Sequence, residues 1–122
     1  MALKHNIDGI IVGSTIPYKS KKTKHIGRAG VGGKVTQEKA TESLWTMYKL
    51  TEGKIPLISS GGIFTGRDVY ERMQNGASLV QIYSAFAYRG YRTPGLILDE
   101  LHEEMEKEGV DDISSIVGSK IE

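Results

Sequence analysis

Residues 58–63 read ISSGGI, and residues 80–84, one strand–helix unit later, read VQIYS. Each stretch begins with the apolar run of a buried parallel strand, and the first ends in two consecutive glycines. Glycines at such a position let a ligand approach the backbone, whose N–H groups and following helix start form an anion site. In (β/α)8 barrels a phosphate commonly binds between the loops after the last two strands. The candidate phosphate-binding residues are therefore Gly61, Gly62, Tyr83 and Ser84; a tight turn without a ligand is the alternative.

Strand and helix patterns alternate on both sides of these stretches. Buried strands are expected over residues 10–12, 55–59 and 79–83. Helices are expected over residues 38–52, from a capping box at Thr65 to about Asn75, and from Pro94 to the residue before Gly109. Asp112 is expected to cap a final short turn, and the polar, glycine-rich residues 17–36 to form a long loop.

This order of elements predicts right-handed βαβ units and a parallel sheet, which is an α/β fold. The chain has 122 residues, whereas a closed (β/α)8 barrel needs about 200 or more. Three parallel strands leave two edges unpaired. The sheet is therefore either small and open or covered at its edges by a protein partner.

Composition and charge exclude several classes of function. The chain has no cysteine, which excludes disulfides, cysteine-ligated zinc and thiol catalysis. Its three histidines lack a shared metal-ligand spacing, so no metal site is expected. The basic residues lie mostly in the expected loop with few aromatics, which favours a solvated loop over a nucleic-acid surface. The acidic run 99–112 is expected on the solvated side of the last long helix, and no apolar run is long enough to span a membrane.

Several blocks of the sequence together resemble the dihydroorotate dehydrogenases. These blocks are residues 8–12 (DGIIV), 30–34 (GVGGK), 47–51 (MYKLT), 55–58 (IPLI), 60–63 (SGGI) and 76–84 (GASLVQIYS). They occur in the family's order over essentially the whole chain, and they are most similar to the class 2, quinone-reducing, membrane-associated group. The resemblance implies that residues 1–122 form one C-terminal segment of an FMN-binding (β/α)8 barrel. Its last three βα units would be present, incomplete as a closed barrel.

The resemblance also implies roles for individual residues. Gly61, Gly62, Tyr83 and Ser84 match the family's FMN-phosphate loops, and Gly33 matches the glycine of its Ser-Gly-Lys segment near the flavin. Ser14 and Thr15 occupy positions that contact substrate in the family. Two places depart from the pattern. The family's Thr-Asn-Thr-Thr is Gly-Ser-Thr-Ile over residues 13–16, and its Ser before Gly-Lys is Gly32.

The family's catalytic Ser base and flavin-contacting Lys belong to parts of the barrel upstream of this segment. No catalytic residue is therefore expected in the chain, which alone should be inactive. The first hypothesis is a non-catalytic structural subunit of a larger assembly. By resemblance that assembly would be mitochondrial and associated with the inner membrane, with a cytoplasmic location left open. The alternative is the C-terminal piece of an active enzyme that oxidises dihydroorotate to orotate in pyrimidine biosynthesis. The rest of that enzyme would be either a separate chain or a part of the same chain that the given sequence does not include. A phosphate- or flavin-binding module acting alone is a third reading, disfavoured because three strands bury little surface.

Overall fold

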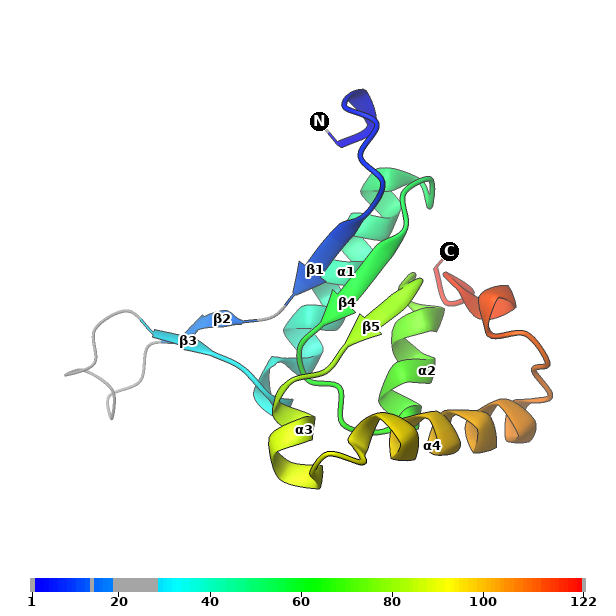
Figure 1. Cartoon of the computed structure of the whole chain (residues 1–122). Coiled ribbons are helices and arrows are strands. Elements are labelled where there is room, and N and C mark those ends of the chain that lie inside the picture. The colour runs from blue at the N-terminus through cyan, green and yellow to red at the C-terminus, as the bar shows by residue number, and fades with distance from the viewer. Residues whose placement is uncertain (1, 14, 19–28, 122) are drawn as a thin grey trace.

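The computed structural model describes residues 2–13, 15–18 and 29–121 of the chain (Figure 1). The strands are β1 (Ile10–Gly13), β2 (Ile16–Tyr18), β3 (Ala29–Val31), β4 (Leu57–Ser60) and β5 (Leu79–Gln81). The α-helices are α1 (Gln37–Thr51), α2 (Gly66–Gln74), α3 (Ser84–Arg89) and α4 (Thr93–Glu108). Short 3-10 turns are η1 (Ala2–Lys4), η3 (Lys34–Thr36) and η4 (Ile113–Ile116).

The main sheet is parallel and has the strand order β1-β4-β5. Helix α1 connects β1 to β4 and helix α2 connects β4 to β5, so each neighbouring pair of strands is one βαβ unit. Within the described residues these three strands form an open sheet rather than a closed barrel (Figure 1). The α/β architecture predicted from the sequence is therefore confirmed as a partial barrel.

The two faces of this sheet differ in what covers them. Val12 and Leu57 point to one face, where they pack with Leu44 of α1 and are almost completely buried. Side chains alternate along a strand, so Ile11 and Leu79 lie on the opposite face, where they are 58% and 63% exposed. One face thus belongs to a hydrophobic core, and the other presents apolar side chains to solvent.

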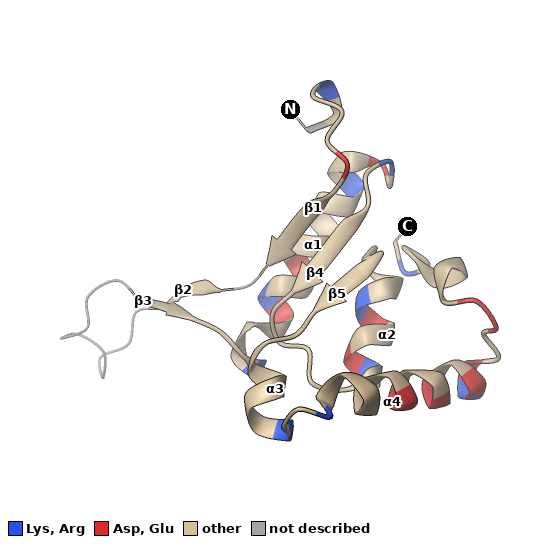
Figure 2. Cartoon of the chain, viewed as in Figure 1, with Lys and Arg blue, Asp and Glu red and all other residues tan. Residues whose placement is uncertain are grey.

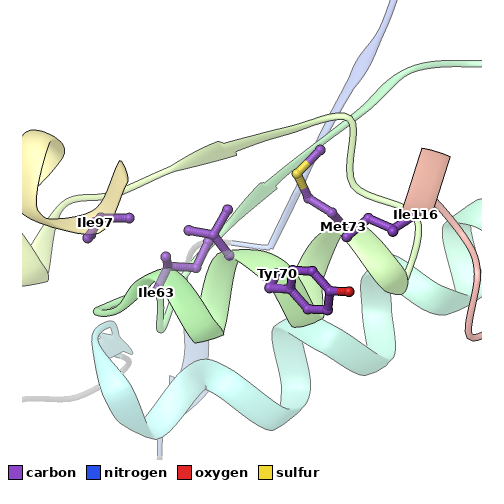
Figure 3. Packing of buried hydrophobic residues seen from close by; sticks show 6 residues of the cluster. Ile63, Tyr70, Met73, Ile97 and Ile116 are labelled. Carbon is purple, nitrogen blue, oxygen red and sulfur yellow. The ribbon is translucent and has the colours of Figure 1, made fainter. Parts of the chain in front are cut away.

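A second core lies between α2, α4 and the C-terminal turn η4. Figure 3 shows Tyr70 and Met73 of α2 with Ile97 of α4 on one side and Ile116 of η4 on the other. Thr65 is the N-cap of α2: its side chain accepts from the Asp68 N–H, and the Asp68 carboxylate accepts from the Thr65 N–H. This is the capping box that the sequence predicts, and it sets the start of the helix that carries this core.

The structure corrects three expectations about the elements. Residues 17–36 are not entirely loop, because β2 and β3 form an antiparallel pair and η3 precedes α1. The third strand ends at Gln81 rather than at residue 83, because Tyr83 already caps α3. The sequence analysis also missed α3 itself. Its six residues are too few to show a helical period.

The acidic run on α4 is only partly a solvated surface. Figure 2 shows acidic residues along this helix, and Glu103 and Glu106 are exposed as expected. Glu100 and Glu104 instead form ion pairs with Arg89 and Arg67. These two carboxylates therefore connect α4 to α3 and α2.

Candidate functional site

The candidate site is a cavity of about 100 Å³ at the carboxyl ends of β4 and β5. It is lined by Thr15, Gly32, Gly33, Ser60, Gly61, Gly62, Ile63, Phe64, Gln81, Ile82, Tyr83 and Ser84. Six of the seven site residues predicted from the sequence are among them. The seventh, Ser14, lies outside the described residues. Four separate segments of the chain thus meet at the place where the sequence predicts a phosphate.

The glycines of the β4–α2 loop have a conformational reason to be glycine. Gly61 and Gly62 have φ angles of +99° and +73°, which L-residues with a side chain rarely adopt. A Cβ on Gly62 would also lie 2.6 Å from the Cα of Gln37 at the start of α1. The tight turn that the sequence suggests as an alternative is therefore present at these two glycines. Because glycine has no side chain, the backbone of this loop borders the cavity directly.

The N–H groups of this loop divide into two sets. Among the described residues, those of Gly61, Gly62 and Ile63 donate to no protein acceptor. The next two, on Phe64 and Thr65, donate to Asp68 Oδ2 at 2.9 and 3.0 Å. The N–H group of the first residue of α2 donates to Glu100 Oε2 at 2.8 Å. Carboxylates of the chain therefore already accept from the N–H groups of Phe64, Thr65 and Gly66, so an anion at the start of α2 would have to compete with them.

Two polar residues of the β5–α3 loop, Tyr83 and Ser84, border the cavity in different ways. The side chain of Tyr83 is 90% exposed, so its backbone N–H is better suited than its hydroxyl to hold a group inside the cavity. Ser84 lies against the loop between β3 and η3, because a Cβ built on Gly33 of that loop would be 3.4 Å from the Ser84 Oγ. Gly33 has a φ of +87°, which favours glycine, although a Cβ at this position would make only an ordinary contact with Ser84.

Charged side chains beneath the cavity connect these loops. The Asp68 carboxylate is 6% exposed and accepts from Lys34 Nζ at 3.2 Å, from the Gln37 side-chain amide and from the two loop N–H groups. Burial alone would raise the pKa of Asp68, but the hydrogen bonds from Phe64 and Lys34 hold that pKa below its usual value. Asp68 is therefore a carboxylate at neutral pH and joins the Gly33 loop to the β4–α2 loop.

Two arginines complete this network. Arg72, which is 1% exposed, donates to Ser59 Oγ, to the Gly61 carbonyl and to the Gln37 carbonyl. Arg89 of α3 donates to the Phe64 carbonyl at 2.6 Å and pairs with Glu100 of α4. Sequence reasoning missed both arginines. The one available signal for Arg72 is a charged residue that directly precedes Met73 on the apolar face of a helix.

The described part of the cavity lining supplies backbone groups and the hydroxyls of Thr15, Ser60, Tyr83 and Ser84. The described residues that line the cavity carry neither a carboxylate nor an imidazole. Nor does the described part of the chain contain a group of three or more His, Asp or Glu that could hold a metal ion. In the same part of the chain, no helix is long and apolar enough to cross a membrane. The site offers backbone N–H donors to an anion.

Comparisons with known proteins give a consistent result. The family model described as dihydroorotate dehydrogenase matches residues 1–105. A mitochondrial dihydroorotate dehydrogenase (quinone) of Oryza sativa is 39% identical, over 98% of this chain and 26% of its own length. A dihydroorotate dehydrogenase (quinone) of Acaryochloris marina is 33% identical, over 98% of this chain and 34% of its own length.

The similarity extends to three-dimensional structure. The ligand-free crystal structure of a dihydroorotate dehydrogenase from Eimeria tenella superposes with a TM-score of 0.89 at 32% identity. That match covers 98% of this chain and 34% of the other. The chain spans about a third or less of the length of these relatives.

Proposed function

The chain belongs to the dihydroorotate dehydrogenase family, and on that premise we propose that it forms the FMN-phosphate-binding side of a flavin-dependent barrel. The observation that carries this proposal is the meeting of two glycine-containing loops and the β5–α3 loop around one cavity, where the N–H groups of Gly61, Gly62 and Ile63 donate to no acceptor among the described residues. In this proposal residues 1–122 are a C-terminal segment of the barrel. The family resemblance and the cavity point to the same ligand through different observations.

The residues present fit the phosphate of FMN. A phosphate ester is a dianion near neutral pH and is bound well by several backbone N–H groups at once. The N–H groups of Gly61, Gly62 and Ile63 are donors of this kind, and all three residues line the cavity. FMN, when bound, accepts the electrons that dihydroorotate gives up. The role of this chain would be to hold the phosphate end of the cofactor through Gly33, Gly61, Gly62, Tyr83 and Ser84.

The open face of the sheet supports a role within a larger barrel. Ile11, Ile58 and Leu79 lie side by side in register across the three strands on this face. Exposure of Ile11 and Leu79 above half is unfavourable for a chain acting alone, since each buried aliphatic side chain contributes about 1.5–3 kcal/mol. We expect the remaining parts of the barrel to cover this face. They would also supply the catalytic Ser base, which the resemblance places upstream of this segment.

The function supported best is therefore that of a piece of an active enzyme that oxidises dihydroorotate to orotate. In this proposal Ser14 and Thr15 keep the substrate-contacting roles that the resemblance implies, and Thr15 also borders the cavity. A quinone as electron acceptor follows from the names of the relatives and is part of the same proposal.

A second candidate is a non-catalytic subunit of a larger mitochondrial assembly. It is favoured by the departures at residues 13–16 and at Gly32, where the family's Asn and Ser are absent. A site that has lost such hydrogen-bonding groups binds its substrate more weakly, by about 1–3 kcal/mol for each group left unpaired. Mitochondrial relatives are found in plants, whereas other relatives are bacterial, so the location belongs to this proposal as well.

The experiment is to isolate the protein in its native assembly and to measure bound flavin and the oxidation of dihydroorotate with a quinone analogue. Equimolar FMN with turnover is the expected result. Replacement Gly62→Ala should remove the flavin, with Gly95→Ala as a control because a Cβ there meets nothing within 4 Å. An assembly of many other proteins with no flavin and no turnover would favour the second candidate. A colourless protein that takes up no added FMN would exclude the first.

A further inference from the structure

We infer that Arg72 is a positioning residue of the phosphate site, which orients the Gly62 N–H towards the cavity and places a positive charge behind it. This inference rests on the proposed function, because it assigns a residue to the same site. Arg72 does not line the cavity and belongs to none of the blocks that carry the family resemblance. Its role follows from its hydrogen bonds and its burial.

The guanidinium group binds three segments of the chain at once. It donates from Nη1 to Ser59 Oγ of β4 at 2.8 Å, and from Nη2 to the Gly61 carbonyl at 2.8 Å. The same Nη2 donates to the Gln37 carbonyl at the start of α1 at 3.0 Å. Arg72 therefore holds the end of β4, the glycine loop and the start of α1 in fixed relative positions.

The bond to the Gly61 carbonyl determines the direction of the next N–H group. In a trans peptide the C=O of one residue and the N–H of the next lie in one plane and point in opposite directions. Arg72 holds the Gly61 carbonyl on the helix side of the loop. The Gly62 N–H consequently points to the other side, where Gly61 and Gly62 border the cavity. Without this bond a glycine pair has wide conformational freedom and no fixed donor direction.

In the described part of the chain the charge of Arg72 forms no direct ion pair, and the carboxylates of Asp68 and Glu71 attract it only from beyond ion-pair distance. Its three acceptors are a hydroxyl and two carbonyls, and no described carboxylate lies within ion-pair distance of it. The nearby carboxylate of Asp68 is already paired with Lys34. A buried charge without a partner is unfavourable. Burial accordingly lowers the pKa of Arg72, although a guanidinium remains protonated at neutral pH. A phosphate dianion in the adjoining cavity supplies the missing negative charge.

The test compares two ligands that differ only in the phosphate. The protein in its native assembly is depleted of flavin and titrated with FMN and with riboflavin, and flavin fluorescence reports the two affinities. Arg72→Met removes the charge and the donors at similar length, whereas Arg72→Lys keeps the charge but cannot make all three bonds. Arg67→Met is the matched control, since it makes the same charge change on an exposed residue of the same helix.

We expect Arg72→Met to lower the affinity for FMN by about tenfold or more relative to riboflavin, as for a lost bond to a charged ligand. Arg72→Lys should show a smaller loss, and Arg67→Met none. A purely structural role would weaken both ligands equally, so an unchanged ratio in a folded Arg72→Met protein overturns the inference. If that variant does not fold, the ratio in Arg72→Lys decides in the same way.

Failure of the proposed function gives a different result. In that case the unaltered protein binds neither flavin, and the inference is decided by inorganic phosphate, followed by its ³¹P resonance. Phosphate binding that Arg72→Lys weakens and Arg67→Met leaves intact would support the role of Arg72. Absence of phosphate binding by the unaltered protein, or equal binding by all variants, would overturn it.

Discussion

Two neighbouring rows of side chains cross the same three strands and have opposite surroundings. One row consists of Val12, Ser59 and Val80, and the next of Ile11, Ile58 and Leu79. The first row faces the helices, and its members are buried or half-buried. The second row is more apolar, yet Ile11 and Leu79 are largely exposed. Hydrophobicity alone therefore does not tell which face of this sheet is the core of the chain. The helical crossovers do, because both of them return on one side.

The largest expected effect separates the two faces directly. Leu57→Ala removes a side chain that is 0% exposed and packed against Leu44, so the free energy of unfolding should fall by about 2–5 kcal/mol. Leu79→Ala, at 63% exposure, should cost less than about 1 kcal/mol in the chain by itself. Urea unfolding of both variants measures the difference. Similar losses from both would show that the open face is covered in solution.

A second prediction concerns the packing of α4 against α2. The first residue of α2, Gly66, lies so close to α4 that an added Cβ would overlap the backbone of Glu100 and Leu101. Gly66→Ala should therefore destabilise the fold by about 1–3 kcal/mol, because the two helices must move apart.

The matched control for Gly66 is another helical glycine. Gly95 of α4 has nothing within 4 Å of the position of a Cβ. Gly95→Ala should stabilise the fold by about 0.5–1 kcal/mol through the lower entropy of the unfolded chain. Thermal unfolding of both variants tests the pair. If Gly66→Ala left the stability unchanged, α4 would not be packed tightly against α2. The covered side of the sheet would then be less rigidly packed than the structure indicates.

The elements that could be predicted are those with a local signal. The capping box at Thr65, the stop after α1 and the period of α4 each identify a helix from residues close in sequence. The pair β2–β3 has no such signal, because each strand has three residues and the pairing brings Pro17 opposite Gly30. Its formation depends on contacts between segments distant in sequence, to which periodicity is insensitive.

The candidate site divides in the same way. Its glycines could be predicted because a glycine pair after a strand is a local pattern. The network of Lys34, Asp68, Arg72, Arg89 and Glu100 could not, because it joins residues of η3, α2, α3 and α4 that meet only in the folded chain. The direction of α2 decides that Arg72 points under the glycine loop. A sequence pattern shows that this residue is charged but not that it is buried.

The smallest expected effect is the contribution of the Asp68 carboxylate to the free energy of unfolding and its dependence on pH. Burial tends to raise the pKa of Asp68, but the Phe64 N–H and Lys34 overcome this tendency and keep that pKa lowered. A group with a lowered folded pKa contributes stability above its unfolded pKa and loses that contribution as the pH falls through the folded value. The unfolding free energies of the unaltered protein and Asp68→Asn should therefore differ at neutral pH. They should converge below about pH 4, the usual range of an aspartate.

Asp99→Asn is the control for this acid dependence, because Asp99 is exposed and forms no ion pair with another described residue. Its difference from the unaltered protein at neutral pH should be small, since Asp99 makes none of the bonds that Asp68 makes. A constant difference for Asp68→Asn would show that the Lys34 and loop N–H bonds contribute little in solution. Convergence would show the opposite. The covered side would then hold the β4–α2 loop in place by charge as well as by packing.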